Sequence, residues 1–179
     1  MATFFTGLCT LPRAVLYIAA QVVGAIVGSY FLRLGLGDAF FPTEVIPGCT
    51  IDTRYCSVGQ MWVMEFMLSQ VLIFIAFGVG LDPRQAKVFG AALAPILVGS
   101  SLALATLAGS IVNRGYSGVS FNPARCIGLM TAKGFLQYHW VHWTAPLAAA
   151  MLNGLFYQFA PPYVRDKPLI QYNPLHRSV

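Results

Sequence analysis

The chain has 179 residues, of which 57% are hydrophobic and only 9% are charged, and its mean hydropathy is +0.67. Soluble proteins carry about 25% charged residues, so this composition excludes a soluble domain and indicates an integral membrane protein. The net charge of +5 comes from Lys and Arg residues scattered between apolar segments, without the basic clusters typical of nucleic-acid binding. We therefore expect the lipid bilayer, and no nucleic acid, as a partner.

The first two apolar segments differ in length. Residues 2–11 are too few to span a bilayer, so we expect a re-entrant or buried segment there. Residues 14–32 are long enough to span, and Gln21 is their one strongly polar side chain. Gly24 and Gly28 form a small-residue face in this span, which predicts close contact with another helix.

A long polar connection, residues 35–58, contains Cys49 and Cys56. In an oxidising compartment these two cysteines could form a disulfide, and two free thiols are the alternative. The second span, residues 61–81, contains Glu65. An ionisable side chain inside a span is unfavourable unless it is paired, so Glu65 predicts a polar contact inside the bundle.

The remaining spans are expected at residues 88–112 and 140–159. The first of these carries no charge, and Pro95 is tolerable within it as a kink. Aromatic residues at both ends of the second are typical of the membrane interface. We expect His139 and His142 at this interface because no partner with metal-ligand spacing accompanies them.

A shorter helix is predicted between these two spans. Asn122 is a preferred N-cap residue, and Pro123 suits the first helical position, so a Gly-rich loop over residues 115–121 should end in a helix that runs to about residue 131 or 133. This is about half the length needed to cross a bilayer. Arg125 lies in its first turn. Without further support, an ordinary capped helix with Arg125 as an interfacial anchor remains the alternative.

The two short segments together predict a pore. If each enters from one side, their N-termini could meet at the bilayer midplane, where non-helical backbone is tolerated only against a cavity or inside protein. Two facing helix N-termini oppose cations, protons included, while the Asn122 amide donates a hydrogen bond to a neutral oxygen. Arg125 adds a fixed charge and several donors. We infer a filter for small uncharged polar molecules.

The box Asn122-Pro123-Ala124-Arg125 resembles the second signature box and selectivity arginine of the aquaporin, or major intrinsic protein, family. The resemblance extends along the chain to Arg13–Ile26 (third span), Glu65 and Ser69 (fourth), Ala94, Pro95 and Gly99 (fifth), and Tyr116-Ser117-Gly118 (last loop). Cys126, directly after Arg125, resembles the X intrinsic protein subgroup of plants and fungi. That subgroup is associated with glycerol, urea, boric acid and hydrogen peroxide as well as water.

The resemblance implies an all-α membrane protein with an aquaporin-like right-handed helical bundle. About four spanning helices, one complete half-helix and one partial half-helix form a single domain over residues 1–179, with residues 163–179 as a cytoplasmic tail. The family has six spans and two Asn-Pro boxes, so the first two spans and most of the first box would be missing. We expect a truncated gene model that begins at an internal methionine, Met1, rather than a naturally short channel.

The resemblance also assigns the pore. The implied pore and selectivity residues are Asn122, Pro123, Ala124, Arg125, Val119 and Thr106, and Glu65 and Gly118 would support the pore loop. Glu65 is expected to brace residues 115–121 rather than to carry protons. Val119 and Thr106 would make the filter wider and less polar than a histidine-bearing water filter, which favours glycerol-like solutes.

The expected function is a passive channel for water and small uncharged solutes (glycerol, urea, hydrogen peroxide, boric acid) that excludes ions and protons. It needs no cofactor or metal, and the family implies a homotetramer. No catalytic set of side chains indicates an enzyme. The alternatives are a non-conducting fragment or regulatory subunit that associates with full-length relatives, and a transporter with a broken helix. The positive-inside rule predicts a cytoplasmic C-terminus and an external Cys-bearing loop, and we expect the plasma membrane.

Overall fold

The computed structural model describes residues 1–37, 46–112 and 114–159. The expected tail, residues 163–179, lies outside the described residues, as does part of the Cys-bearing connection. Every regular element of the described part is a helix, which confirms the expected fold class. The elements are α1 (Ala2–Phe5), α2 (Leu11–Leu36), α3 (Val58–Ala76), the π-helical η1 (Phe77–Leu81), α4 (Pro83–Val112), α5 (Pro123–Lys133) and α6 (Val141–Phe159).

Three stretches of the described chain are long and apolar enough to cross a membrane. They are Leu11–Leu36, Val58–Leu81 and Ala92–Ile111. The fourth expected span forms helix α6 but is not among these three. The three stretches expose large apolar side chains, such as Phe31 in α2 and Ile111 in α4. Because a bilayer accepts such side chains, this pattern agrees with an integral membrane protein.

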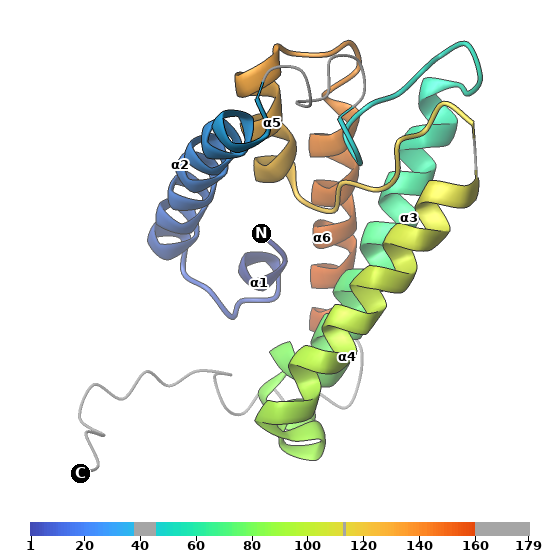
Figure 1. The fold of residues 1–179 in the computed structure, drawn as a ribbon. Coiled ribbons are helices and arrows are strands. Elements are labelled where there is room, and N and C mark those ends of the chain that lie inside the picture. The colour runs from blue at the N-terminus through green and yellow to red at the C-terminus, as the bar shows by residue number, and fades with distance from the viewer. Residues whose placement is uncertain (38–45, 113, 160–179) are drawn as a thin grey trace.

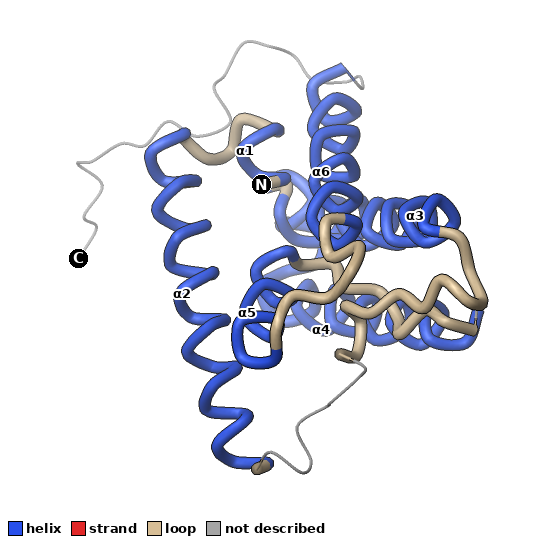
Figure 2. The backbone as a smooth tube through the Cα atoms, turned by 90° about the horizontal axis from the view of Figure 1, so that it is seen from above, coloured by secondary structure: helices blue, strands red, loops and turns tan. Residues whose placement is uncertain are grey.

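The two short helices α1 and α5 lie between α2 on one side and α3, α4 and α6 on the other (Figures 1 and 2). α5 packs against α2, and α1 packs against α6. The N-terminal ends of α1 and α5 point toward each other in Figure 1. The predicted pair of inward-directed half-helices is therefore present, although α1 is only 4 residues long.

The close approach of two helices occurs at a different glycine from the expected one. A Cβ built on Gly24 or Gly28 meets no described atom within 4 Å, so the small-residue face does not make the predicted contact within the described chain. Instead Gly128 of α5 lies against α2, where a Cβ would come within 2.8 Å of Ala25 Cβ and closer still to the Ala25 carbonyl. Glycine is needed on the half-helix, not on the spanning helix.

The predicted span at residues 88–112 also needs correction. Inside α4 the backbone leaves helical geometry at Gly90 (φ 72°, ψ 166°), and the apolar part able to span begins at Ala92. Glycine accepts this positive φ without the steric cost that a side chain would add. Pro95, where a kink was expected, lies within the helix that follows the break.

The buried core lies mainly where the loops pack on the half-helix. One cluster consists of Ile46, Cys49, Cys126 and Met130, and a second of Cys56, Met61, Tyr116 and Val119. Both clusters join the 46–58 loop to residues around Asn122. The core therefore positions the candidate site.

Candidate functional site

The loop before α5 descends into the molecule without helical structure. Its turns use positive φ at Gly115 (85°), Gly118 (100°) and Phe121 (56°). A Cβ on Gly118 would lie 3.0 Å from Ser110 Oγ, so this glycine allows both the backbone conformation and the close approach to α4. The path of the loop past α4 therefore depends on a glycine at position 118.

A second loop runs beside this one and satisfies part of its backbone. Gly48 N–H donates to the Ser117 carbonyl (2.8 Å), Ser117 N–H to the Thr50 carbonyl (3.2 Å), and Asp52 N–H to the Gly115 carbonyl (2.7 Å). These cross-loop bonds replace the helix ladder that an irregular segment lacks. The two loops therefore form one unit.

Helix α5 begins as the sequence predicts. Asn122 is the N-cap, its Oδ1 accepts from Ala124 N–H (3.0 Å), and Pro123 occupies the first turn. The helix ends at Lys133, which confirms the predicted length. Because the cap uses Oδ1, the amide nitrogen of Asn122 is the part of this side chain that can donate to a solute.

Arg125 follows in the first turn of α5 and contacts the other loop. Its Nη2 donates to the Pro47 carbonyl (2.7 Å), and its Nη1 lies 3.8 Å from Cys49 Sγ. A Cβ on Gly48 would come within 2.6 Å of Nη1, so only glycine leaves room for the guanidinium. Arg125 remains exposed. Its charge is held by a backbone carbonyl while several of its donors face open space.

Glu65 on α3 is fully buried and binds the descending loop. Its carboxylate accepts from Tyr116 Oη (2.5 Å), from the backbone N–H of Ser120 (2.9 Å) and Phe121 (3.1 Å), and from the Ser120 hydroxyl. Hydrogen bonds to an ionised acceptor are stronger than neutral ones, which suits a segment without its own ladder. The predicted polar contact inside the bundle is present, and its partner is the pore loop.

His142 is buried inside the helix bundle, whereas a residue on the bundle surface at the membrane interface was expected. Its side chain is 1% exposed, and its Nδ1 lies 3.5 Å from Glu65 Oε2. The sequence places His142 near the start of α6 but does not show that α6 packs against α3, which is why its burial was not expected. His142 is thus a further member of the cluster around Glu65.

The cysteines pair differently from the expected alternatives. Cys49 forms a disulfide with Cys126, 77 residues away, and Cys56 is a buried free thiol. Neither a Cys49–Cys56 bridge nor two free thiols in the loop is correct, and Cys126 is not simply a small packing residue. Sequence spacing alone could not indicate the pair, because the partners come from a loop and a helix that only the fold brings together.

Two cavities meet at the start of α5. One has a volume of about 800 Å³ and the other about 570 Å³, and both are bordered by Gln21, Asn122, Ala124 and Arg125. The larger also touches Met1, Thr106, Val119 and Pro123, so all six expected pore and selectivity residues border it. Gln21 is the residue that sequence reasoning left without a role. Its position as the polar side chain of an apolar span was the available signal.

The side chains around the cavities differ from those of a metal site. Among them, no group of three or more His, Cys, Asp and Glu side chains could hold a metal ion. The polar side chains around the larger cavity include the amides of Gln21 and Asn122, the hydroxyls of Thr106 and Ser120, and the Arg125 guanidinium. Such groups bind neutral solutes through hydrogen bonds.

Comparison with known proteins identifies the family of this chain. The sequence model described as "Major intrinsic protein" matches residues 1–157. The chain belongs to the major intrinsic protein family. Its relatives include Aquaporin TIP4-1 of Zea mays (34% identity over 85% of this chain and 54% of the relative) and Aquaporin-6 of Rattus norvegicus (35%, 84% and 50%). Aquaporin-4 of Bos taurus is 32% identical over 89% of this chain and 46% of its own length.

Membership of the major intrinsic protein family confirms the resemblance read from residues 122–125. The chain spans about half the length of the curated relatives it matches. The finer resemblance to the X intrinsic protein subgroup stays a prediction, as do the pore roles of the individual residues.

Proposed function

We propose that this chain contributes to a passive transmembrane channel for water and small uncharged solutes that excludes ions and protons. The observation that supports this most directly is the start of α5, where the Asn122 cap and Arg125 border two cavities that share these residues. A helix N-terminus carries a partial positive charge, to which the guanidinium adds. Cations are therefore repelled at the point where a neutral solute finds hydrogen-bond donors.

The remaining lining of the larger cavity supports glycerol-like solutes. Thr106 borders the larger cavity, and its hydroxyl donates to the Leu102 carbonyl (2.8 Å), so its proton is already used. Val119 borders the same cavity with only 3% of its surface exposed, and Leu102 and Ile127 add apolar side chains to the lining. A polyol has hydroxyls along one edge and C–H groups along the other, which fits a cavity lined by both hydrogen-bond donors and apolar side chains. Urea, boric acid and hydrogen peroxide are further candidates.

The assembly and location belong to the same proposal. Homotetramers, the plasma membrane and a cytoplasmic C-terminus are the expected arrangement, with residues 1–179 as one domain. Neither a cofactor nor enzymatic activity is part of the mechanism, because the polar groups at the cavities bind and orient a solute without changing its bonds.

Flux through reconstituted protein tests the channel. Proteoliposomes should swell faster than empty liposomes in a glycerol gradient, with a rate nearly independent of temperature. Arg125→Val should admit larger or charged solutes, because it removes the fixed charge and the donors from the filter. Thr10→Ala, at an exposed position outside the cavities, is the matched control.

The alternatives predict different results. A slow, saturable, ion-coupled flux would favour a transporter. Flux no faster than through empty lipid would favour a non-conducting subunit that associates with full-length relatives. Unchanged selectivity in Arg125→Val would remove this residue from the filter.

A further inference from the structure

The loop over residues 46–50 lies against the guanidinium of Arg125. The Pro47 carbonyl accepts a hydrogen bond from Nη2, and Gly48 leaves no space for a side chain beside Nη1. Gly48 is equally close to the pore loop, because a Cβ there would come within 2.8 Å of the Val119 carbonyl. This loop therefore limits where the Arg125 side chain can lie.

A covalent bond joins the same loop to the helix that carries Arg125. Cys49 follows Gly48, Cys126 follows Arg125, and the two cysteines form a disulfide. Both are buried, at 1% and 0% exposed, among Ile46 and Met130. The bond joins the residue after Arg125 to a residue two positions beyond Pro47, so it holds the two backbone segments that carry the carbonyl and the guanidinium close together.

The cross-loop hydrogen bonds hold the loop to a different segment. Gly48 and Thr50 bind Ser117, which lies in the descending loop and not on α5. Apart from the disulfide, the contacts between the 46–50 loop and α5 include the hydrogen bond of Arg125 to Pro47 and a contact of Cys126 Sγ with the Gly48 carbonyl (3.7 Å). Ile46 and Met130 also lie in one apolar cluster. Breaking the covalent bond leaves only these weaker contacts to hold the loop at Arg125.

We propose that the Cys49–Cys126 disulfide is a positioning element of the pore that holds Pro47 and Gly48 against Arg125, so that its reduction changes which solutes pass. A dithiol reductant breaks the S–S bond, transfers two electrons to the protein sulfurs and leaves two protein thiols, while the reductant becomes a cyclic disulfide. The effect on solutes rests on the proposed channel function. The effect on Arg125 does not.

Thiol counting tests whether the bond exists. After oxidation in air, denatured chain should react with maleimide at two cysteines, Cys9 and Cys56, and at four after reduction. Denaturation is needed because burial, with a contribution from Asp52, raises the pKa of the Cys56 thiol and slows its reaction in the folded protein. Four reactive thiols before reduction would overturn the proposal.

Arginine modification tests the positioning without any flux. Phenylglyoxal should modify Arg125 at least threefold faster after reduction or in Cys49→Ser, as measured by peptide mass spectrometry. Cys56→Ser is the matched control, since it alters a buried cysteine of the same loop region that takes no part in the bridge, and its Arg125 should react as in the wild type. If Cys49→Ser does not fold, the reduced wild-type protein answers the same question. Equal reactivity before and after reduction would overturn the positioning role.

Permeability tests the consequence. The ratio of glycerol to water permeability should change at least threefold when reconstituted protein is reduced and return after reoxidation. Cys56→Ser keeps the bridge and should respond to the reductant as the wild type does, whereas the ratio in Cys49→Ser should not respond. A ratio that does not change although Arg125 becomes more reactive would overturn the link to selectivity. Absence of flux in both redox states would contradict the proposed function alone, and the first two measurements would still decide whether the disulfide positions Arg125.

Discussion

At the scale of single residues, the buried Glu65 carboxylate determines whether the pore loop keeps its shape. In Glu65→Gln the acceptor loses its charge and one of its two oxygens becomes an NH₂ group, so either the N–H groups of Ser120 and Phe121 or the Tyr116 hydroxyl lose their acceptor. Hydrogen bonds to charged groups contribute about 1.5–3 kcal/mol each, so we expect a loss of about 3 kcal/mol in stability. The midpoint of thermal unfolding in detergent should fall by roughly 6–12 °C.

A matched carboxylate variant separates this effect from a general loss of charge. Asp52 is paired with Arg54 (2.6 Å) at the surface, where Arg54 holds the pKa of Asp52 below its usual value. Exposed ion pairs contribute little, so Asp52→Asn should unfold close to the wild-type temperature. A Glu65→Gln protein that unfolds as late as Asp52→Asn would show that the carboxylate does not brace the loop.

Local chemistry explains which residues could be interpreted from sequence. The Asn122 cap, Pro123 in the first turn and the end of the helix at Lys133 were predictable because each depends on neighbours in the chain. Glu65 was predictable as a polar contact because of its cost in lipid, but not its partners. The positions of His142 and Pro47 depend on the packing of distant segments, for which a single sequence gives no signal.

At the scale of elements, the crossing of α5 and α2 depends on Gly128. Any side chain there would press against the Ala25 backbone, so Gly128→Leu should move the half-helix and with it Asn122 and Arg125. Overpacking of this kind costs about 1–3 kcal/mol. We expect a lower unfolding temperature and, in proteoliposomes, a loss of solute flux.

The control variant for this crossing is Gly24→Ala. A Cβ at this position meets no described atom within 4 Å, and alanine is favoured over glycine in a helix by up to about 1 kcal/mol. Its stability should equal or exceed that of the wild type. If Gly128→Leu is as stable and as active as Gly24→Ala, the tight crossing does not position the half-helix.

These glycines also show how far patterns predict packing. The spacing of Gly24 and Gly28 predicted close contact with another helix, but small residues suit any close neighbour and do not identify it. The contact depends on which face α5 presents, which follows from the cap and the loop before it. Gly90 is similar, because the sequence allows a break there but equally allows one at Pro95.

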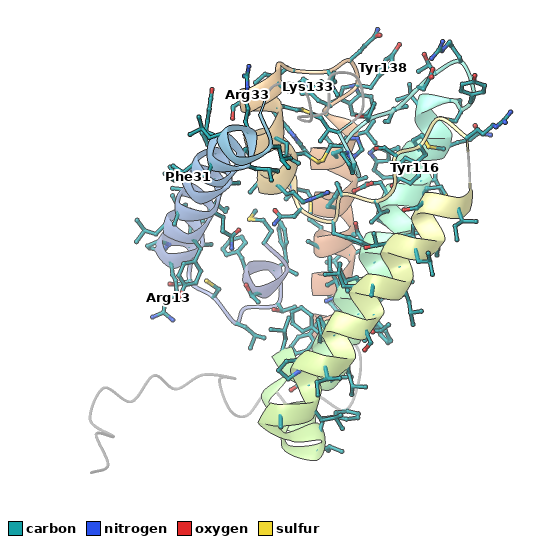
Figure 3. The ribbon with its side chains drawn as sticks, viewed as in Figure 1. Arg13, Phe31, Arg33, Tyr116, Lys133 and Tyr138 are labelled. Atoms are coloured by element: carbon teal, nitrogen blue, oxygen red, sulfur yellow. A yellow bond between two sulfur atoms is a disulfide. The ribbon has the colours of Figure 1, made fainter. Side chains whose placement is uncertain are left out.

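At the scale of the whole molecule, cations of α2 and α5 lie at two ends. Arg33 and Lys133 lie at one end, and Arg13 lies at the other (Figure 3). Composition alone was enough to predict a membrane protein. The distribution of cations along the sequence assigned Arg33 and Lys133 to one side of the membrane and Arg13 to the other, and the same grouping is found at the two ends of the structure. The re-entrant path was predictable only because α5 is too short to span and has a cap that begins inside the apolar region.

Site-specific labelling tests this path directly. A chain that dips into the bilayer and returns must have Arg114, before the pore loop, and Phe135, after α5, on the same face of the membrane. Both residues are exposed. In sealed vesicles, Arg114→Cys and Phe135→Cys in a Cys9→Ser background should react with a membrane-impermeant maleimide from one face, while the native Cys9 reacts from the opposite face. The positive-inside rule further predicts that Cys9 is labelled from the cytoplasmic side. Reaction of position 135 from the same side as Cys9 would mean that α5 crosses the membrane, and the half-helix that brings Asn122 to the cavities would not exist.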